Sequence, residues 1–235
     1  MSDVLDQALH CLKEGRFALV YDFDDRERET DMVIASQFVS PTAIRTMRQD
    51  AGGLICTTAS YEVAQKLQLP FLVDVLANSY PSYPVLSRLA PNDIPYDTKS
   101  AFSITINHRR TFTGITDNDR ALTTSEFAKL AKAALQESSN QAREDFGRNF
   151  RSPGHVHLLN ASQQLLVKRK GHTELSTALL ALSGLVPSAT ICEMMGEDGN
   201  ALSKEKAKDY ARRYDLCFLE GQGIIDAWNG SGRGK

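Results

Sequence analysis

Several features that mark specialised classes of protein are missing from this sequence. No apolar run approaches the roughly 20 residues that cross a bilayer, and residues 1–15 carry acids and a lysine but no apolar block, so we expect no signal peptide. The four cysteines (Cys11, Cys56, Cys192 and Cys217) have no metal-clip spacing such as CxxC. Free thiols in a chain of this size favour a reducing, cytoplasmic location.

An excess of charge of one sign is also missing. The chain has 27 basic and 29 acidic residues, a net charge of −2, which gives no electrostatic reason to expect nucleic acid or a membrane as partner. Aromatic residues are only 8%, whereas an RNA-binding face needs exposed aromatic side chains on a basic surface. The 24% charged and 42% hydrophobic residues are close to the globular average and exclude wholesale disorder and a coiled-coil rod.

What is present indicates one folded domain. A chain of 235 residues can form a single large core. Helical and strand patterns interleave, which predicts a single α/β (α+β) domain over residues 1–228, with a mixed sheet and helices packed on its faces. Residues 229–235 are predicted to form a flexible C-terminal tail. Predicted strands lie near residues 17–21, 32–38, 54–57, 101–107, 156–159, 189–194 and 216–219, and predicted helices near 4–13, 41–50, 60–67, 123–136, 161–167, 172–183 and 204–214.

Two stretches show little periodicity. Residues 70–99 hold five of the eight prolines and are predicted to be a long ordered loop, which at this length is more often functional than structural. Residues 140–153 are polar and are predicted to be irregular.

The densest polar cluster is residues 22–31, where six acids and two arginines follow a predicted strand. Carboxylates this close repel one another unless a cation or a shared proton neutralises some of them. Mg²⁺, held by one or two carboxylates and by substrate oxygens, would do so. A solvated acidic loop between two strands is the alternative.

A basic cluster occupies residues 168–174. Three basic residues, a glycine and the start of a predicted helix at His172 favour a phosphate site, and His172 could also ligate a metal. A basic loop with an ordinary helix start is the alternative.

Three weaker candidates remain. A turn at residues 151–155 fixes His155, and hydroxyl groups around Thr111 and Thr113 follow a predicted strand. Glu193 lies inside an otherwise apolar strand, where a carboxylate needs a partner or takes a raised pKa, as a general acid or base does. A lone histidine is more often structural than catalytic, and the hydroxyl groups either bind phosphate oxygens or only make a turn. A structural ion pair would explain Glu193 equally well.

Six motifs in this order resemble the 3,4-dihydroxy-2-butanone 4-phosphate synthase family over about residues 3–228. They are DRERETDM (25–32), DAGGLIC (50–56), TFTGITDNDR (111–120), RSPGH (151–155), GHTE (171–174) and ICE (191–193). The resemblance implies a monofunctional lyase of riboflavin biosynthesis, which converts D-ribulose 5-phosphate with Mg²⁺ or Mn²⁺ into L-3,4-dihydroxy-2-butanone 4-phosphate and formate. It also implies a homodimer with its sites at the subunit interface. Glu-Thr-Asp at residues 29–31 is similar to the archaeal branch.

The resemblance also assigns residues. It implies metal ligation by Glu27 and His172, and turnover that depends on His155 and Glu193. The substrate-binding positions that it implies are Arg26, Glu27, Asp31, Thr111, Thr113, Arg169, Lys170, Gly171, His172, Thr173 and Glu193. Lys170 departs from the glycine that bacterial relatives often have.

Loss of the proton beside the ketone would give an enediol, followed by dehydration, skeletal rearrangement and formate loss. Our hypothesis is that Asp31 or Glu29 handles the first proton transfer, and that His155 and Glu193 serve later steps. Cys56 would lie near the site, either as a buried small apolar residue or, if exposed, as an oxidation target.

Two other functions stay open at this point. A different metal-dependent sugar-phosphate isomerase or aldolase would use the same enediol chemistry without releasing formate. A sugar-phosphate binding module would have lost catalysis.

Overall fold

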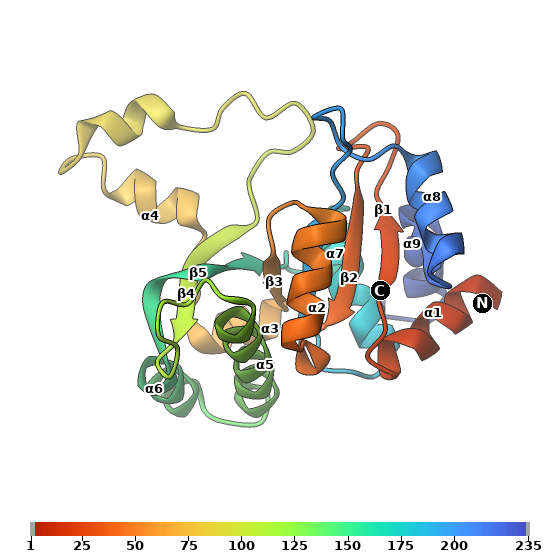
Figure 1. Cartoon of the computed structure of the whole chain (residues 1–235). Coiled ribbons are helices and arrows are strands. Elements are labelled where there is room, and N and C mark those ends of the chain that lie inside the picture. The colour runs from red at the N-terminus through yellow and green to blue at the C-terminus, as the bar shows by residue number, and fades with distance from the viewer. Residues whose placement is uncertain (1–2, 234–235) are drawn as a thin grey trace.

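The structure, a computed structural model, describes residues 3–233 (Figure 1). Within these residues a seven-stranded sheet has the order β4-β5-β3-β6-β2-β1-β7. β1 pairs in parallel with β7 and β3 with β5, and the other neighbours are antiparallel. This confirms the single α/β domain with a mixed sheet. The strands are β1 (Ala18–Tyr21), β2 (Thr30–Ala35), β3 (Cys56–Ala59), β4 (Phe102–His108), β5 (Phe150–Asn160), β6 (Ala189–Glu193) and β7 (Cys217–Glu220).

Helices cover both faces of the sheet (Figure 1). They are α1 (Asp3–Lys13), α2 (Pro41–Thr46), which continues as a π-helix (Met47–Ala51), α3 (Tyr61–Leu67), α4 (Leu72–Asn78), α5 (Asp117–Ala134), α6 (Ser139–Asn149), α7 (His172–Leu182), α8 (Lys204–Arg213) and α9 (Gly221–Gly230), with short 3-10 helices at Ser36–Phe38, Pro84–Leu89 and Leu165–Val167. Among the helices of residues 3–233, none combines the length and the apolar character that a bilayer crossing needs.

The central strands are buried on both faces. Successive side chains of a strand point to opposite faces, so Ala18 and Val20 join a core with α1, α7 and α9, whereas Leu19 joins a second core with α2 and α8. A third core packs α3, α5 and α6 against β4 and β5. Burial on both sides explains why the sequence of β1 is an unbroken apolar run.

The helix predicted from residue 123 begins earlier, at Asp117. The Thr116 Oγ1 atom accepts a hydrogen bond from the backbone N–H of Asp119 at 3.1 Å and caps α5. Thr123 lies buried inside this helix, where its Oγ1 accepts a hydrogen bond from the backbone N–H of His108 at 3.0 Å. The apparent capping residue therefore holds β4 to α5.

Both stretches predicted to be irregular contain helices. Residues 70–99 include α4 and the 3-10 helix Pro84–Leu89, which project together from the body of the molecule (Figure 1). Residues 140–153 include most of α6, capped by the Ser138 side chain, and the start of β5. Conversely, the helix predicted near 161–167 is only the 3-10 helix Leu165–Val167.

α9 is a helix that the sequence patterns did not predict. Gly221 and Gly223 in its first turn lower the intrinsic propensity, but burial of Ile224 and Trp228 stabilises the helix. α9 continues through residues 229–230, so the predicted flexible tail is helical where it was expected to start. Residues 234–235 of that tail lie outside the described part of the chain.

Candidate active site

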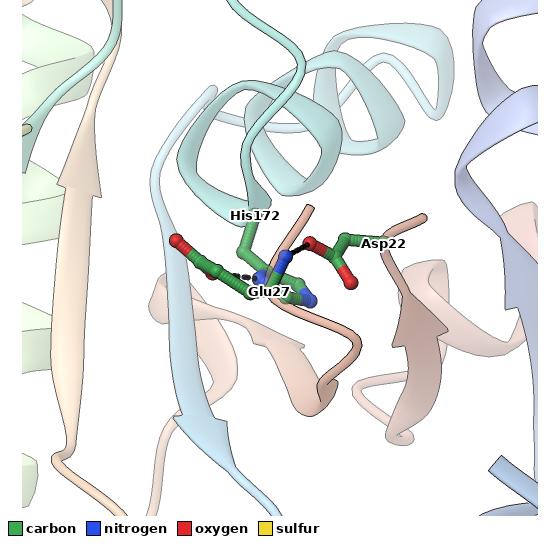
Figure 2. A group of neighbouring side chains, drawn as sticks. All are labelled: Asp22, Glu27 and His172. Carbon is green, nitrogen blue, oxygen red and sulfur yellow. Dashed lines mark hydrogen bonds and ion pairs between the residues drawn. The ribbon is translucent and has the colours of Figure 1, made fainter. Parts of the chain in front are cut away.

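Asp22, directly after β1, shapes the loop that joins β1 to β2. Its Oδ2 accepts a hydrogen bond from the backbone N–H of Glu27 at 2.9 Å, and its Oδ1 accepts one from the N–H of Glu29 at 3.1 Å. The Asp22 side chain is fully buried, so these bonds replace those that water would make. Arg28 turns the loop with a φ of 62°, a conformation that few L-residues adopt. The loop is therefore a fixed turn that directs Glu27 toward α7 (Figure 2).

Glu27 meets His172, the first residue of α7. Glu27 Oε2 lies 3.1 Å from His172 Nδ1, and the histidine side chain is buried. Burial alone would raise the pKa of Glu27, but the hydrogen bond and charge of His172, together with Arg26, lower it to about 2. Burial alone would lower the pKa of His172, but Asp31 and Glu27 raise it to about 9. Without a metal, the pair is therefore an ion pair at neutral pH.

The other ring nitrogen of His172 is held by the backbone. Nε2 lies 3.2 Å from the carbonyl oxygen of Glu29. A carbonyl oxygen can only accept a hydrogen bond, so His172 Nε2 carries the hydrogen and donates the hydrogen bond. In the neutral ring the Nδ1 lone pair then points toward Glu27. A histidine whose second nitrogen donates to a carbonyl is oriented as metal-ligating histidines are.

This donor set fits a small divalent cation. Adjacent octahedral ligands at the Mg²⁺ distance of about 2.1 Å are about 3.0 Å apart, close to the 3.1 Å between Glu27 Oε2 and His172 Nδ1. Asp22 offers a third ligand atom within 4.8 Å of the other two. Both Asp22 oxygens already accept hydrogen bonds from the loop, so Glu27 and His172 are the better ligands.

Asp31 and Glu193 face each other across the paired strands β2 and β6. Asp31 is buried, and its Oδ1 accepts no hydrogen bond from any described residue, lying 3.6 Å from His172 Nε2. Burial raises the pKa of Asp31 well above its ordinary value. The charge of His172 lowers this pKa, and the charge of Glu193 raises it further. Burial and the charge of Glu27 also raise the pKa of Glu29. Carboxylates with a raised pKa are effective proton acceptors.

Glu193 is positioned by the segment before β3. Its Oε2 accepts a hydrogen bond from the backbone N–H of Leu54 at 2.7 Å. Gly53 packs directly on it, since a Cβ added to Gly53 would lie 2.6 Å from the Glu193 carbonyl oxygen and even nearer to its carboxylate. In the sequence GGL at 52–54, Gly53 therefore leaves space for Glu193, and the backbone N–H of Leu54 binds its carboxylate.

Two arginines close one side of the site. Asp97 accepts hydrogen bonds from Arg169 Nε at 2.5 Å and from Arg26 Nη2 at 3.1 Å. Arg169 Nη1 donates to the buried Glu174 at 2.7 Å, and Arg26 Nη1 lies 3.0 Å from Glu27. Burial would raise the pKa of Asp97, but the charge and hydrogen bond of Arg169 lower it. Asp97 thus stays ionised between two fixed guanidinium groups.

A cavity of about 350 Å³ opens over this cluster. Its volume is in the range of small-molecule sites. Seven of the predicted site residues line it: Glu27, Glu29, Asp31, Arg169, His172, Thr173 and Glu193. Residues of segment 94–102 also line it. Arg26 and Lys170 instead line a neighbouring cavity of about 550 Å³, and Asp97 and Arg169 border both. Gly171 leaves room for the arginines, because a Cβ there would lie 2.8 Å from Arg26 Nη2.

Five predicted site residues line neither cavity: Cys56, Thr111, Thr113, His155 and Gly171. His155 Nδ1 lies 3.2 Å from the side-chain nitrogen of Asn107. Thr111 Oγ1 accepts a hydrogen bond from Arg151 at 3.1 Å, and Thr113 lies near Asp119. His155 belongs to β5, and the two threonines belong to the loop after β4.

Cys56 does not meet the condition for an oxidation target. It is 2% exposed, and burial raises the pKa of its thiol well above the ordinary value, helped by Glu193 and Asp31. The oxidation role was conditional on exposure of the thiol, and the structure does not meet that condition for Cys56. The alternative interpretation, a small buried apolar residue, agrees with this burial.

Sequence reasoning missed Asp97 and Tyr96. Tyr96 lines the cavity and lies under Arg26, with the guanidinium carbon 5.4 Å from its ring centre. The available signal was the predicted functional character of the long segment 70–99. No pattern distinguishes one aspartate of that segment from its neighbours, so the pattern could not identify Asp97.

The chain is similar to proteins of known name along most of its length. The sequence profile of 3,4-dihydroxy-2-butanone 4-phosphate synthase matches residues 6–227. A 3,4-dihydroxy-2-butanone 4-phosphate synthase of Methanothermobacter thermautotrophicus is 50% identical over 226 residues, 96% of each chain. The riboflavin biosynthesis protein RibBA of Staphylococcus aureus strain N315 is 30% identical over 224 residues, 95% of this chain and 49% of that one.

A solved structure of the same name is also similar. It is described as a 3,4-dihydroxy-2-butanone 4-phosphate synthase in complex with two magnesium ions. It superimposes with a TM-score of 0.73 at 25% identity and covers 100% of both chains.

Proposed function

Because this chain belongs to the 3,4-dihydroxy-2-butanone 4-phosphate synthase family, a family of lyases, we propose that it converts D-ribulose 5-phosphate into L-3,4-dihydroxy-2-butanone 4-phosphate and formate in riboflavin biosynthesis. The two products together contain all the atoms of the substrate, so the reaction needs no second substrate and no redox partner. The observation that carries the proposal is the Glu27–His172 pair in a cavity that the buried Asp31 and the half-buried Glu29 also line.

Glu27 and His172 hold Mg²⁺, or Mn²⁺ in its place. When bound, the cation supplies positive charge that stabilises negative charge on the oxygens of a ketose. Support comes from the 3.1 Å between the two ligand atoms and from the backbone contact that orients His172. The solved synthase with two magnesium ions is consistent with this role.

Asp31 or Glu29 accepts the proton from the carbon next to the ketone. Both line the cavity and both have a raised pKa, which strengthens a carboxylate as a base. Glu193 lies opposite Asp31 on β6. We assign Glu193 and His155 to the later proton transfers, which accompany dehydration, skeletal rearrangement and loss of formate.

The phosphate end of the substrate lies at the start of α7. Backbone N–H groups at a helix N-terminus favour anions, and Arg169 and Thr173 border the cavity there. Arg26 acts by fixing Glu27 and Asp97, and Gly171 by leaving space for Arg26. Lys170 lines the adjoining cavity and adds positive charge near the phosphate.

The active form is a homodimer. His155, Thr111 and Thr113 are separate from the cavity, so a second copy is needed to bring them to a substrate. Phe112, between the two threonines, is 94% exposed, and Leu89 on the projecting segment is 69% exposed. Large apolar side chains this exposed favour an interface. For the location of the enzyme we infer the cytoplasm, because its four cysteines are free.

The test is an assay for formate. The purified chain with ribulose 5-phosphate and Mg²⁺ is expected to release formate, and Glu27→Gln is expected to release none while keeping its fold. Glu144→Gln, at an exposed site on α6, is the matched control with the same chemical change. Consumption of ribulose 5-phosphate without formate would identify an isomerase or an aldolase instead.

A further inference from the structure

Cys11 and Cys217 bring two thiols together away from the active-site cavity. Their sulfur atoms lie 3.9 Å apart although 206 positions separate them in the sequence. Cys11 is near the end of α1, and Cys217 is the first residue of β7, the edge strand of the sheet. α1 and β7 contribute to the same core, so this helix–strand packing fixes the approach of the two sulfurs.

The pair is reachable from solvent. Both cysteines line a cavity of about 680 Å³ between α1, α8 and β7. Cys217 is partly exposed, whereas Cys11 is buried. Cys56 and Cys192 are buried elsewhere and do not line this cavity. An external thiol reagent therefore meets Cys217 first and Cys11 second.

Arg16 lies beside the pair. Its Nη1 donates toward Cys11 Sγ at 3.5 Å, and its Nη2 is held by the carbonyl and carboxylate of Asp215. The positive charge of Arg16 opposes the rise that burial causes in the pKa of Cys217. The other charged groups that line the cavity are His10, Lys208, Arg212, Asp215 and Glu220. Burial raises the pKa of Cys217 to about 11, so only a small fraction of this thiol is ionised at neutral pH and its exchange with a disulfide is slow.

We propose that Cys11 and Cys217 are a modification site, which forms an intrachain disulfide by exchange with a low-molecular-weight disulfide such as oxidised glutathione. The Cys217 thiolate attacks one sulfur of the small disulfide, and one small thiol leaves. Cys11 then attacks the Cys217 sulfur of the mixed disulfide, and the second small thiol leaves. The protein loses two hydrogen atoms, and the small disulfide is reduced to two thiols.

The bond needs only a short movement and has a mechanical effect. The sulfurs must approach from 3.9 Å to about 2.05 Å. The disulfide would then tie α1 to the edge strand and close a loop of more than 200 residues, which restricts the unfolded chain and raises the unfolding temperature. The two cavities share no lining residue, so turnover should not change. This inference does not depend on the proposed function.

The test uses the unaltered chain. After incubation with oxidised glutathione, the protein is alkylated, digested with trypsin and analysed by mass spectrometry. We expect a cross-linked peptide that joins residues 1–13 to residues 214–233, the loss of two of the four titratable thiols, and a higher unfolding temperature that dithiothreitol reverses. The Cys217→Ala variant should lose all three effects, and Cys192→Ala should keep them.

Three results would overturn the proposal. These are four free thiols after the treatment, glutathione that stays attached to Cys217 without a cross-link, and a cross-linked peptide that contains Cys56 or Cys192. Each can be seen in the unaltered chain, so the proposal stays testable even if a variant does not fold.

Discussion

The Oε2 atom of Glu27 lies 3.1 Å from Nδ1 of His172, although 145 positions separate the two residues in the chain. The first comes from a loop that Asp22 fixes, and the second from the first turn of α7. Because both side chains are already held in place without a cation, binding of the cation costs little conformational entropy. Their role as metal ligands remains a prediction.

Removing either ligand should weaken metal binding. We expect Glu27→Gln and His172→Asn each to lower the affinity for Mg²⁺ by about tenfold or more, since each leaves the cation with one protein ligand of the pair. Isothermal titration calorimetry with Mg²⁺ alone measures this without any turnover. Wild-type affinity in Glu27→Gln would contradict the assignment, and Glu144→Gln controls for the loss of a negative charge.

The stability of the metal-free chain should depend on pH through the same pair. The pKa of His172 is raised from 6.5 to about 9, so its contribution to the free energy of unfolding is complete below pH 6.5 and is lost as the pH rises through 9. The pKa of Glu27 is lowered from 4.5 to about 2, so its contribution is present above pH 4.5 and is lost as the pH falls through 2. Urea unfolding in EDTA should therefore show stability falling between pH 6.5 and 9.

Two comparisons test whether the Glu27–His172 pair causes this pH dependence. In Glu27→Gln the fall between pH 6.5 and 9 should be smaller, because His172 has lost a partner. Mg²⁺ displaces the proton from His172, so the affinity of the protein for Mg²⁺ should rise between pH 6.5 and 9. An equal fall in both proteins would assign the pH dependence to other groups.

Removing the carboxylate of Asp97 should strengthen the binding of inorganic phosphate. Asp97 accepts hydrogen bonds from Arg26 and Arg169 and so competes with an external anion for both. We expect Asp97→Asn to bind phosphate several-fold more tightly, equivalent to about 1 kcal/mol. Asp93→Asn, an exposed aspartate on the same segment, is the control. Weaker phosphate binding would mean that Asp97 instead holds the arginines in place for the phosphate.

Gly53→Ala should reduce activity and should also lower stability, because the added methyl group would clash with the backbone carbonyl oxygen of Glu193 as well as with its carboxylate. The added methyl group would push against the Glu193 carboxylate and move it from its hydrogen bond with Leu54. Formate release should fall by about tenfold or more, as expected when a catalytic group is misplaced. Gly147→Ala on α6, where the methyl group meets nothing within 4 Å, should keep full activity. Unchanged formate release in Gly53→Ala would remove Glu193 from the reaction.

If His155 serves the cavity of a partner subunit, two inactive variants should complement each other. Mixed and reassociated Glu27→Gln and His155→Ala chains would form heterodimers with one intact site, which gives about a quarter of the wild-type activity at random assembly. Neither variant alone should release formate. If the mixture also stays inactive while heterodimers form, His155 and Glu27 belong to the same subunit's site. Formate release by His155→Ala alone would mean that His155 is not needed.

Local patterns predicted most elements of the central sheet and failed where tertiary contacts override propensity. Thr123 has the sequence context of a helix cap, but its hydroxyl serves β4 through His108. α9 begins with two glycines and still forms, because Ile224 and Trp228 are buried. In both cases, a contact with a distant part of the chain outweighs the local preference.

For the site, the sequence determined which chemical groups are available and the tertiary structure decided which of them meet. The acids of residues 22–31, His172 and Glu193 are visible as residue types in unusual surroundings, because charge and burial patterns are local properties of a chain. Three other features are not visible in that way: the proton on His172 Nε2, the hydrogen bonds of Asp97 with two arginines, and the approach of Cys11 to Cys217. Each is a contact between segments that are tens to hundreds of positions apart, and only the packing of helices on the sheet brings such segments together.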